Sequence, residues 1–454
     1  MSAAPAGRPP RSLLFVGAHT LSSNIVGIVI AFVTGVFVTR LFAPGEKGAY
    51  NLLLATTELM IMVFGLSLNS GVLYTIASGR AAAGALLSRL MVIAVPQVLL
   101  VAGFLSMISL TPLRSALLPA EFDASIIVVV AMFTISLFQG YGRIILTAIG
   151  QIPRSNLIDL AIRSTLLGAM LVCWIAVLPL TGEAAVMYLI GTHLLALGIA
   201  LIVSYSSVRH ILLATHTGAA ALPLTMTYAM TSFVANLAQF LSYRLDVFFV
   251  AHFAGVTQLG IYTLAVGLAQ MLWLLANAIA QVLLPHVAAS GEGIIRDTAA
   301  ASRIACMASV VTALMLALCG GWLVPLIYGQ TFAAAVRPLL ILLPGVTLFA
   351  VVTVLAAYLS GIGKPHLNLR ASLAGLVVTI FLDLLLIPRF GIDGAAIAST
   401  CSYVVTFCII VWTYVQQTGE RVSHLLVPQH EDLVLVRRLL VSFRQRLRRQ
   451  RTNT

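Results

Sequence analysis

The sequence predicts an all-α polytopic membrane protein with about twelve transmembrane helices in two parallel six-helix lobes and both termini cytoplasmic. Three observations predict this fold class. Only 9% of the 454 residues are charged and 60% are apolar, whereas soluble domains carry about 25% charged residues. Long apolar runs follow one another along the chain, and landmarks of the first half recur about 212 residues later.

The apolar runs define the expected spans, because a bilayer core about 30 Å thick requires about 20 helical residues. Arg8 and Arg11 precede a run that continues to Phe42, which favours a first span over a cleaved signal peptide. No connection between spans is long enough for a catalytic domain. The expected spans are 13–41, 48–77, 87–110, 124–149, 157–180, 184–206, 225–253, 260–288, 301–323, 338–361, 368–387 and 394–416.

The net charge of +12 reports membrane orientation rather than nucleic-acid binding. Basic residues gather in alternate loops, and these loops are expected to be cytoplasmic together with both termini. The cytoplasmic set comprises Arg8, Arg11, Arg80, Arg89, Arg154, Arg209, Arg296, Arg303, Lys364, Arg370 and the basic tail.

The internal repeat divides the chain into two halves of six spans. Gly48 and Tyr50 recur as Gly260 and Tyr262, and Gly182 recurs as Gly394. An even number of spans makes the repeat parallel, a recurring design of secondary transporters, although any duplicated helical bundle would show it. The expected divisions are lobe 1–208, cytoplasmic linker 209–224, lobe 225–416 and basic tail 417–454.

Polar residues follow one face of the second span and recur in the eighth. Asn51, Glu58, Gly65 and Asn69 lie at helical spacing, and their repeat equivalents are Thr263, Gln270, Asn277 and Gln281. Polar groups within spans commonly mark a substrate path. The alternative is interhelical hydrogen bonding, worth about 1 kcal/mol per contact. Glu58 is a possible proton site, because burial disfavours a charged carboxylate.

The seventh span carries a second polar face, formed by Ser232, Asn236, Gln239, Tyr243 and Asp246. Arg244 cannot pair with Asp246 within the helix, since two residues turn through about 200°. It either offers positive charge to an anionic substrate or extends to the membrane interface. Asp159 and Arg163 are expected to form a local ion pair. Arg143 and Asp383 are expected to be solvated at span ends.

No catalytic, cofactor or metal-binding pattern is present in the sequence. Zinc-protease, phosphate-loop and nucleophile-elbow motifs are absent, and the five cysteines lack metal-ligand spacing. The expectation is therefore a non-enzyme without cofactor. In the tail, Leu433, Val436, Leu440, Phe443 and Leu447 predict an amphipathic helix that binds anionic lipid, the alternative being a disordered basic tail.

Four segments resemble polysaccharide and lipid-linked oligosaccharide flippases of the multidrug/oligosaccharidyl-lipid/polysaccharide exporter superfamily. They are Thr39 to Tyr50, Asp246 to Tyr262, Gly361 to Lys364 and Ile387 to Ala396. The resemblance implies two lobes in a V that move an undecaprenyl-pyrophosphate-linked glycan across a bacterial cytoplasmic membrane. It implies Arg244 and the polar faces as cavity lining, and other polysaccharide-assembly membrane proteins as partners.

Two departures narrow the resemblance within the superfamily. Peptidoglycan-precursor flippases usually have two further C-terminal spans, whereas this sequence predicts a basic tail after about twelve spans. This difference disfavours a peptidoglycan precursor as the substrate. Multidrug antiporters generally carry a carboxylate in the first span, whereas residues 13–39 contain neither Asp nor Glu. A proton- or sodium-coupled small-molecule exporter remains the alternative, with Glu58 as its coupling residue.

Overall fold

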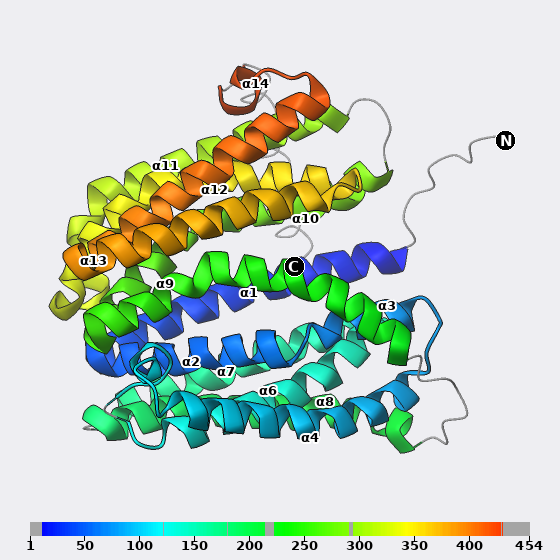
Figure 1. Cartoon of the computed structure of the whole chain (residues 1–454), viewed down its shortest axis with the longest axis vertical. Coiled ribbons are helices and arrows are strands. Elements are labelled where there is room, and N and C mark those ends of the chain that lie inside the picture. The colour runs from blue at the N-terminus through cyan, green and yellow to red at the C-terminus, as the bar shows by residue number, and fades with distance from the viewer. Residues whose placement is uncertain are drawn as a thin grey trace, which may run out of the picture. The chain divides into compact units, whose positions relative to one another are not determined.

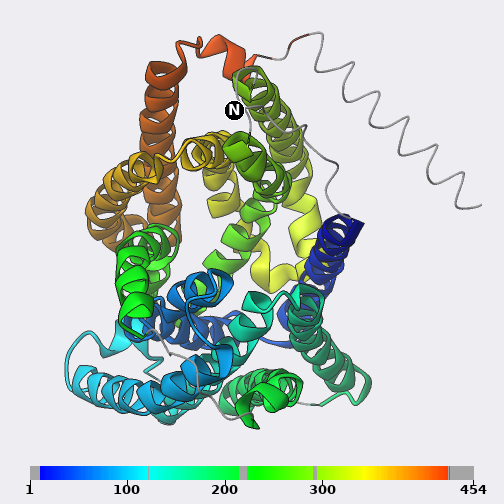
Figure 2. The ribbon, with the colours of Figure 1, turned by 90° about the vertical axis from the view of Figure 1, so that its right-hand side faces the viewer.

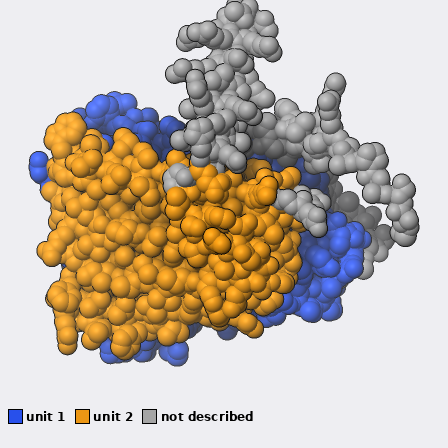
Figure 3. Space-filling model, turned by 90° about the horizontal axis from the view of Figure 1, so that it is seen from above, with its two compact units in different colours: residues 1–240, 247–261, 327–332 blue, residues 241–246, 262–326, 333–454 orange. Residues whose placement is uncertain are grey.

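The computed structural model describes residues 11–120, 122–178, 180–213, 222–289, 294–427 and 429. Over these residues the chain is helical with short connections and contains no strand. It divides into two compact units, which Figure 3 colours separately. Unit 1 comprises 1–240, 247–261 and 327–332, and unit 2 comprises 241–246, 262–326 and 333–454. The part of the seventh span up to residue 240 thus groups with unit 1. The lobe boundary at 209–224 remains a prediction.

The helices of the first half are connected by short turns (Figure 1). Within unit 1, α6 packs against α2, α3, α4 and α8, while α1 packs mainly on α7. Their bounds are α1 Arg11–Leu41, α2 Pro44–Phe64, α3 Leu68–Ala77, α4 Ala83–Ile108, α5 Arg114–Leu117, α6 Ser125–Ala148, α7 Ile152–Ile175 and α8 Gly182–Leu213.

The helices of the second half include the two longest in the chain. In unit 2, α12 packs against both α10 and α13, an arrangement that Figure 2 shows from a second direction. The bounds are α9 Leu222–Gln270, α10 Trp273–Ala289, α11 Ile294–Tyr328, the 3₁₀ helix η1 Gln330–Ala335, α12 Val336–Gly361, α13 Pro365–Thr418 and α14 Ser423–Leu426.

The multi-pass membrane assignment is confirmed by the length and exposure of these helices. Within the described residues, nine helices are long and apolar enough to cross a membrane, or ten if α2 and α3 form one bent span. Large apolar side chains face outward, with Leu318 84% and Ile127 75% exposed. Such surfaces are stable against lipid and unfavourable in water.

Two of these helices are each long enough to hold a pair of spans, as the predicted repeat requires. α9 has 49 residues and α13 has 54, whereas about 20 residues cross a bilayer. Gly255 interrupts α9 with a φ of 84° and Gly391 interrupts α13 with a φ of 57°. The positions 212 residues earlier, Ala43 and Pro179, fall in the α1/α2 and α7/α8 junctions. The total of twelve spans remains a prediction.

The start of α2 is fixed by its sequence and by a close helix crossing in unit 1. Pro44 occupies the first turn, and the Glu46 carboxylate accepts a hydrogen bond from the Ala43 amide at 2.7 Å. A Cβ on Gly48 would lie 1.7 Å from the Val256 carbonyl oxygen, and one on Gly260 would lie 1.9 Å from the Pro44 carbonyl oxygen. The glycines that mark the repeat therefore face each other's backbone reciprocally.

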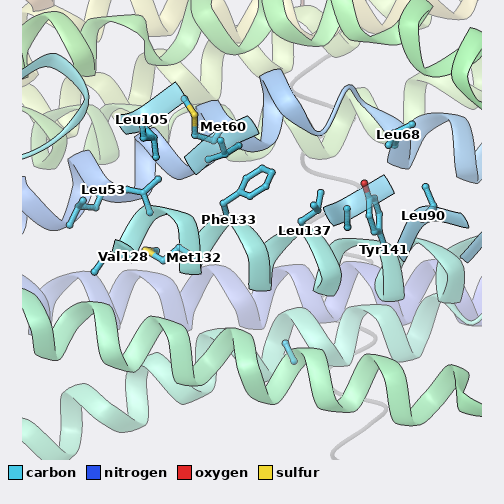
Figure 4. Close-up of a cluster of buried hydrophobic side chains, with 14 of the residues drawn as sticks. Leu53, Met60, Leu68, Leu90, Leu105, Val128, Met132, Phe133, Leu137 and Tyr141 are labelled. Carbon is cyan, nitrogen blue, oxygen red and sulfur yellow. The ribbon is translucent and has the colours of Figure 1, made fainter. Parts of the chain in front are cut away.

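The core of unit 1 lies between α2, α3, α4 and α6. Figure 4 shows Phe133 and Tyr141 of α6 pointing toward the broken helix formed by α2 and α3, with Met60 on one side of the break and Leu68 on the other. These side chains are at most 1% exposed. This packing holds the two pieces of the broken span in place without a continuous backbone helix between them.

The chain beyond α13 is anchored within unit 2 by α11. The Arg303 guanidinium donates to the His424 carbonyl oxygen at 2.6 Å, and the Ser302 hydroxyl donates to that of Leu425 at 3.2 Å. The chain before the basic tail is thus fixed at the start of α11. The predicted amphipathic helix over 433–447 lies outside the described residues.

Candidate functional site

The second span is broken in its middle. α2 ends at Phe64, α3 begins at Leu68, and the two helices meet at an angle of 54°. Leu66 and Ser67 both have a φ of 51°, a left-handed conformation that costs a non-glycine residue about 1–3 kcal/mol and is concentrated at functional sites. Broken helices at membrane depth occur where they are buried in protein or line a water-filled cavity.

Side chains from three other helices form hydrogen bonds at or beside the break. Gln97 of α4 donates from Nε2 to the Phe64 carbonyl oxygen at 2.7 Å, and Tyr141 of α6 donates to Gln97 Oε1 at 2.9 Å. Asn236 of α9 donates to the Ser67 hydroxyl at 3.1 Å. The break in unit 1 is therefore stabilised by specific hydrogen bonds from neighbouring helices. Sequence analysis missed Gln97, whose only signal is a polar side chain within an apolar run.

Replacing Gln97 by leucine is expected to destabilise the protein by about 1–3 kcal/mol, because the Phe64 carbonyl oxygen and the Tyr141 hydroxyl both lose their partner. Tyr141→Phe, which removes only the outer hydrogen bond, should cost about 1 kcal/mol. Thermal unfolding of the two purified variants measures the order of these effects. Equal stability of Gln97→Leu and the wild type would contradict this account of the break.

The eighth span, which is the repeat equivalent of the second, is also interrupted. α9 ends at Gln270 and α10 begins at Trp273, and the indole N–H of Trp273 donates to the Val346 carbonyl oxygen at 3.1 Å. Interrupted segments in both halves of a repeat point to a transporter's binding site, although residues 66–67 correspond to 278–279 under the 212-residue offset and the second interruption lies at 271–272. The first part of each unit's candidate site is therefore its own interrupted span, the second span in unit 1 and the eighth in unit 2.

The predicted polar faces are exposed only in part and are not continuous. Glu58, Asn69, Asn277 and Gln281 are exposed, as residues that line a path would be. The break, however, separates Asn69 from the helical face that carries Glu58. The interruption after Gln270 likewise separates it from Asn277 and Gln281, while Asn51 and Gln270 are partly buried. The expectation of one straight stripe on each span was wrong, because a helical register does not continue across a break.

The expected burial of Glu58 was also wrong. Its side chain is exposed on α2 and is not enclosed by other side chains of the described residues. Its assignment as the proton site remains a prediction. The buried carboxyl groups lie instead in unit 2.

Asp246 and Asp383 form a buried carboxyl pair in unit 2, the second part of the candidate site. Asp246 of α9 is 6% exposed and accepts a hydrogen bond from the Tyr262 hydroxyl at 2.6 Å. Asp383 of α13 is completely buried, and neither of its carboxyl oxygens has a hydrogen-bond partner in the structure described. The two groups are close enough to interact electrostatically. Asp383 was expected to be solvated at a span end, and this expectation was wrong.

Hydroxyl groups on α9 and α13 complete an oxygen-rich surrounding for the pair. Thr379, one helical turn before Asp383, has a buried hydroxyl that forms no hydrogen bond with any residue described. The Ser399 hydroxyl lies 3.4 Å from that of Tyr262. A completely buried carboxyl group such as that of Asp383 is costly to ionise. This arrangement can take up a proton or a small hard cation, which prefers oxygen ligands.

The remaining predicted residues of the seventh span have varied surroundings. Tyr243 packs in an aromatic cluster of unit 2, with its ring centroid 5.9 Å from that of Trp273 and 5.7 Å from that of Phe349. Arg244 is partly buried and Gln239 is exposed. Tyr243 therefore has a packing role, whereas a role for Arg244 in substrate binding remains a prediction.

The predicted local ion pair on α7 was wrong. Asp159 pairs with Arg143 of α6, with 2.5 Å between the Arg143 Nη1 and Asp159 Oδ2 atoms. Arg163 donates to the Gly27 carbonyl oxygen of α1 at 3.2 Å. Tertiary contacts thus override the spacing of four residues that favours pairing along one helix.

The repeat, the interrupted spans and the buried carboxyl pair together define the fold of a secondary transporter. Residues 38–337 match the model of a family described as "Polysaccharide biosynthesis protein". The chain belongs to this polysaccharide biosynthesis protein family.

Two solved structures share the fold of this chain. A lipid II flippase, MurJ, in an inward closed conformation has the same fold with a TM-score of 0.72 and 12% identity over 94% of this chain and 93% of its own. An inward-facing multidrug MATE transporter gives a TM-score of 0.62 and 17% identity over 89% of this chain and 99% of its own. At these identities the likeness concerns the fold alone.

A curated relative matches part of the chain. The probable low-salt glycan biosynthesis flippase Agl15 of Haloferax volcanii is 24% identical over 186 residues, which cover 39% of this chain and 39% of the relative. The match thus spans well under half of either protein.

Proposed function

We propose that the protein is a flippase that moves an undecaprenyl-pyrophosphate-linked oligosaccharide across the cytoplasmic membrane by alternating access during polysaccharide biosynthesis. The observation that carries this proposal is that two repeat-related spans are each interrupted and each carry exposed polar side chains, such as Glu58 and Asn277. Membership of the polysaccharide biosynthesis family supports the substrate class.

The physical task fits such a site. The headgroup is polar and anionic, whereas the lipid chain remains in the bilayer during transfer. Polar side chains along the path replace water around the sugars, and the Arg244 guanidinium is the candidate contact for the pyrophosphate. The transfer makes and breaks no covalent bond, so the protein does not act as an enzyme.

The Asp246 and Asp383 pair is the proposed energy-coupling site. A proton or sodium ion that binds between the carboxyl groups removes part of their repulsion, so occupancy changes the relative stability of the transport conformations. The same pair would serve a cation-coupled small-molecule exporter. The fold shared with multidrug transporters makes that exporter the second candidate function.

The proposed setting is a bacterial cytoplasmic membrane. The basic tail, rich in arginine from Arg437 to Arg451, would contact anionic lipid on the cytoplasmic face. Other membrane proteins of polysaccharide assembly would supply the substrate and receive the product.

Deleting the gene in its host is expected to cause lipid-linked oligosaccharide to accumulate on the cytoplasmic leaflet while surface polysaccharide falls. Extraction of the lipid-linked pool, combined with labelling of sugars accessible from outside, measures both quantities. Complementation with the wild-type gene is the control. Unchanged lipid-linked pools with normal surface polysaccharide would contradict the proposal, and gradient-dependent drug efflux would favour the exporter.

A further inference from the structure

A close contact in unit 1 aligns α3 with the beginning of α9. A Cβ on Gly71 would lie 2.2 Å from the Thr225 carbonyl oxygen, so only glycine allows this approach. Beside it, the hydroxyl groups of Thr75 and Thr225 are 2.8 Å apart, and both residues are fully buried. The two helices are therefore held in a fixed register at this end of the unit.

This register stacks two tyrosines on each other, three residues beyond Gly71 and Thr225. The ring centroids of Tyr74 and Tyr228 are 4.3 Å apart and their planes differ by 3°. Tyr228 is 40% exposed, so part of its ring is available to a ligand. Tyrosine offers a large, rigid surface with both apolar and polar character.

Arg80 is held beside the stack by the turn that ends α3. Gly79 has a φ of 69°, its amide donates to the Ile76 carbonyl oxygen, and the Arg80 amide donates to that of Thr75, which together form a Schellman motif. The guanidinium carbon of Arg80 lies 5.7 Å from the Tyr74 ring centroid, and Nη1 donates to the Tyr74 hydroxyl at 3.3 Å.

The charge of Arg80 is available to an anion. The side chain is exposed, and in the part of the chain that the structure describes it forms no ion pair. A guanidinium has five N–H donors in a planar fork that matches phosphate oxygens. Because one donor contacts Tyr74, the group is oriented while the others remain available.

The position of this cluster suits substrate loading. Arg80 belongs to the loops predicted to be cytoplasmic, and the start of α9 follows the predicted cytoplasmic linker 209–224. Both elements thus assign the cluster to the side on which a lipid-linked glycan would be presented. Arg80, Tyr74 and Tyr228 combine a cation with an exposed aromatic surface at that side.

We propose that Arg80, Tyr74 and Tyr228 form a docking site for the diphosphate and first sugar of a polyprenyl-diphosphate-linked glycan before transfer. This inference rests on the proposed function. Arg80 binds the diphosphate through charge-assisted hydrogen bonds, and the exposed ring of Tyr228 packs against the apolar face of the sugar. A membrane phospholipid offers a phosphate but no sugar, so the aromatic contact distinguishes the two ligands.

The test measures binding to the full-length protein in nanodiscs of zwitterionic lipid. The probes are polyprenyl-diphosphate-N-acetylglucosamine, polyprenyl monophosphate and phosphatidylglycerol. Arg80→Gln and Tyr228→Leu should each raise the dissociation constant of the sugar probe about tenfold, as expected for losing one charge-assisted or well-packed contact. Tyr228→Leu should leave both sugar-free probes unchanged. Arg89→Gln, an exposed arginine at the same predicted side, is the matched control and should change none.

The outcomes separate this inference from the proposed function. Thermal unfolding identifies variants that fail to fold. Tyr228→Phe keeps the aromatic ring and should retain sugar binding, so it provides a second test of the ring contact where Tyr228→Leu is unstable. Wild-type binding that persists in Arg80→Gln and Tyr228→Leu overturns the docking site alone. Equal weakening of phosphatidylglycerol and the sugar probe by Arg80→Gln also overturns it, since the ligand would then be a lipid phosphate. A wild-type protein that neither binds nor transfers the sugar probe overturns the proposed function as well.

Discussion

Replacing Asp383 by asparagine is expected to remove the dependence of transport on an ion gradient while the protein remains folded. The carboxyl group is fully buried, has no hydrogen-bond partner among the described residues, and interacts with Asp246. A coupling free energy of about 1–3 kcal/mol changes a linked equilibrium about 5- to 150-fold. We therefore expect gradient-driven transport by reconstituted protein to fall about tenfold or more.

The stability of the protein, unlike its transport activity, should not fall when Asp383 is replaced. Replacing buried charged groups by apolar ones is often neutral or stabilising by about 1–4 kcal/mol, so Asp383→Leu should unfold at a temperature no lower than the wild type. Asp123→Asn, on an exposed carboxylate outside the spans, is the control and should alter neither property. Gradient-dependent transport by Asp383→Asn at the wild-type rate would eliminate the pair as the coupling site.

Replacing Gly48 by leucine is expected to prevent stable folding. The first added carbon would lie 1.7 Å from the Val256 carbonyl oxygen, and a backbone atom cannot move aside as a side chain can. The helices would have to separate, and overpacking of this kind costs about 1–3 kcal/mol or, in severe cases, more. Yield and thermal unfolding temperature of the purified protein measure the effect, and Gly260→Leu should behave in the same way because the contact is reciprocal.

Gly267 provides a matched control on α9. An added Cβ there meets nothing within 4 Å, and alanine is favoured over glycine in helices by about 1 kcal/mol. Gly267→Ala should therefore be neutral or slightly stabilising. A Gly48→Leu protein that is as stable as Gly267→Ala would show that the close crossing is not required.

The fold could be predicted from the sequence because its signals are local. Apolar length identifies each span without knowledge of its neighbours. Under the repeat, Gly255 and Gly391 correspond to the positions that separate helices in the first half of the sequence. This correspondence explains why α9 and α13 are each long enough for two spans. Neither the amphipathic tail nor the orientation of the termini is tested by the residues described, and both remain predictions.

The candidate site could be predicted only in part, because burial depends on residues far away in the chain. Asp246 was identified from its own helix, but Asp383 looks like a span-end residue until α13 is packed beside α9. Gly65 was placed on a continuous helical face, and nothing in the local sequence showed that Leu66 and Ser67 would leave the helix. Gln97 and Tyr141 stabilise that break from other spans, so periodicity could not reveal them.

The proposed function requires the protein to transfer a lipid-linked oligosaccharide between leaflets. The most direct measurement reconstitutes the purified protein in liposomes that contain a labelled polyprenyl-diphosphate-oligosaccharide, and follows the fraction accessible to a membrane-impermeant reagent. The account predicts rapid exchange in wild-type liposomes, with gradient-driven exchange reduced about tenfold or more by Asp383→Asn. Exchange in wild-type liposomes that is no faster than in protein-free liposomes would contradict it.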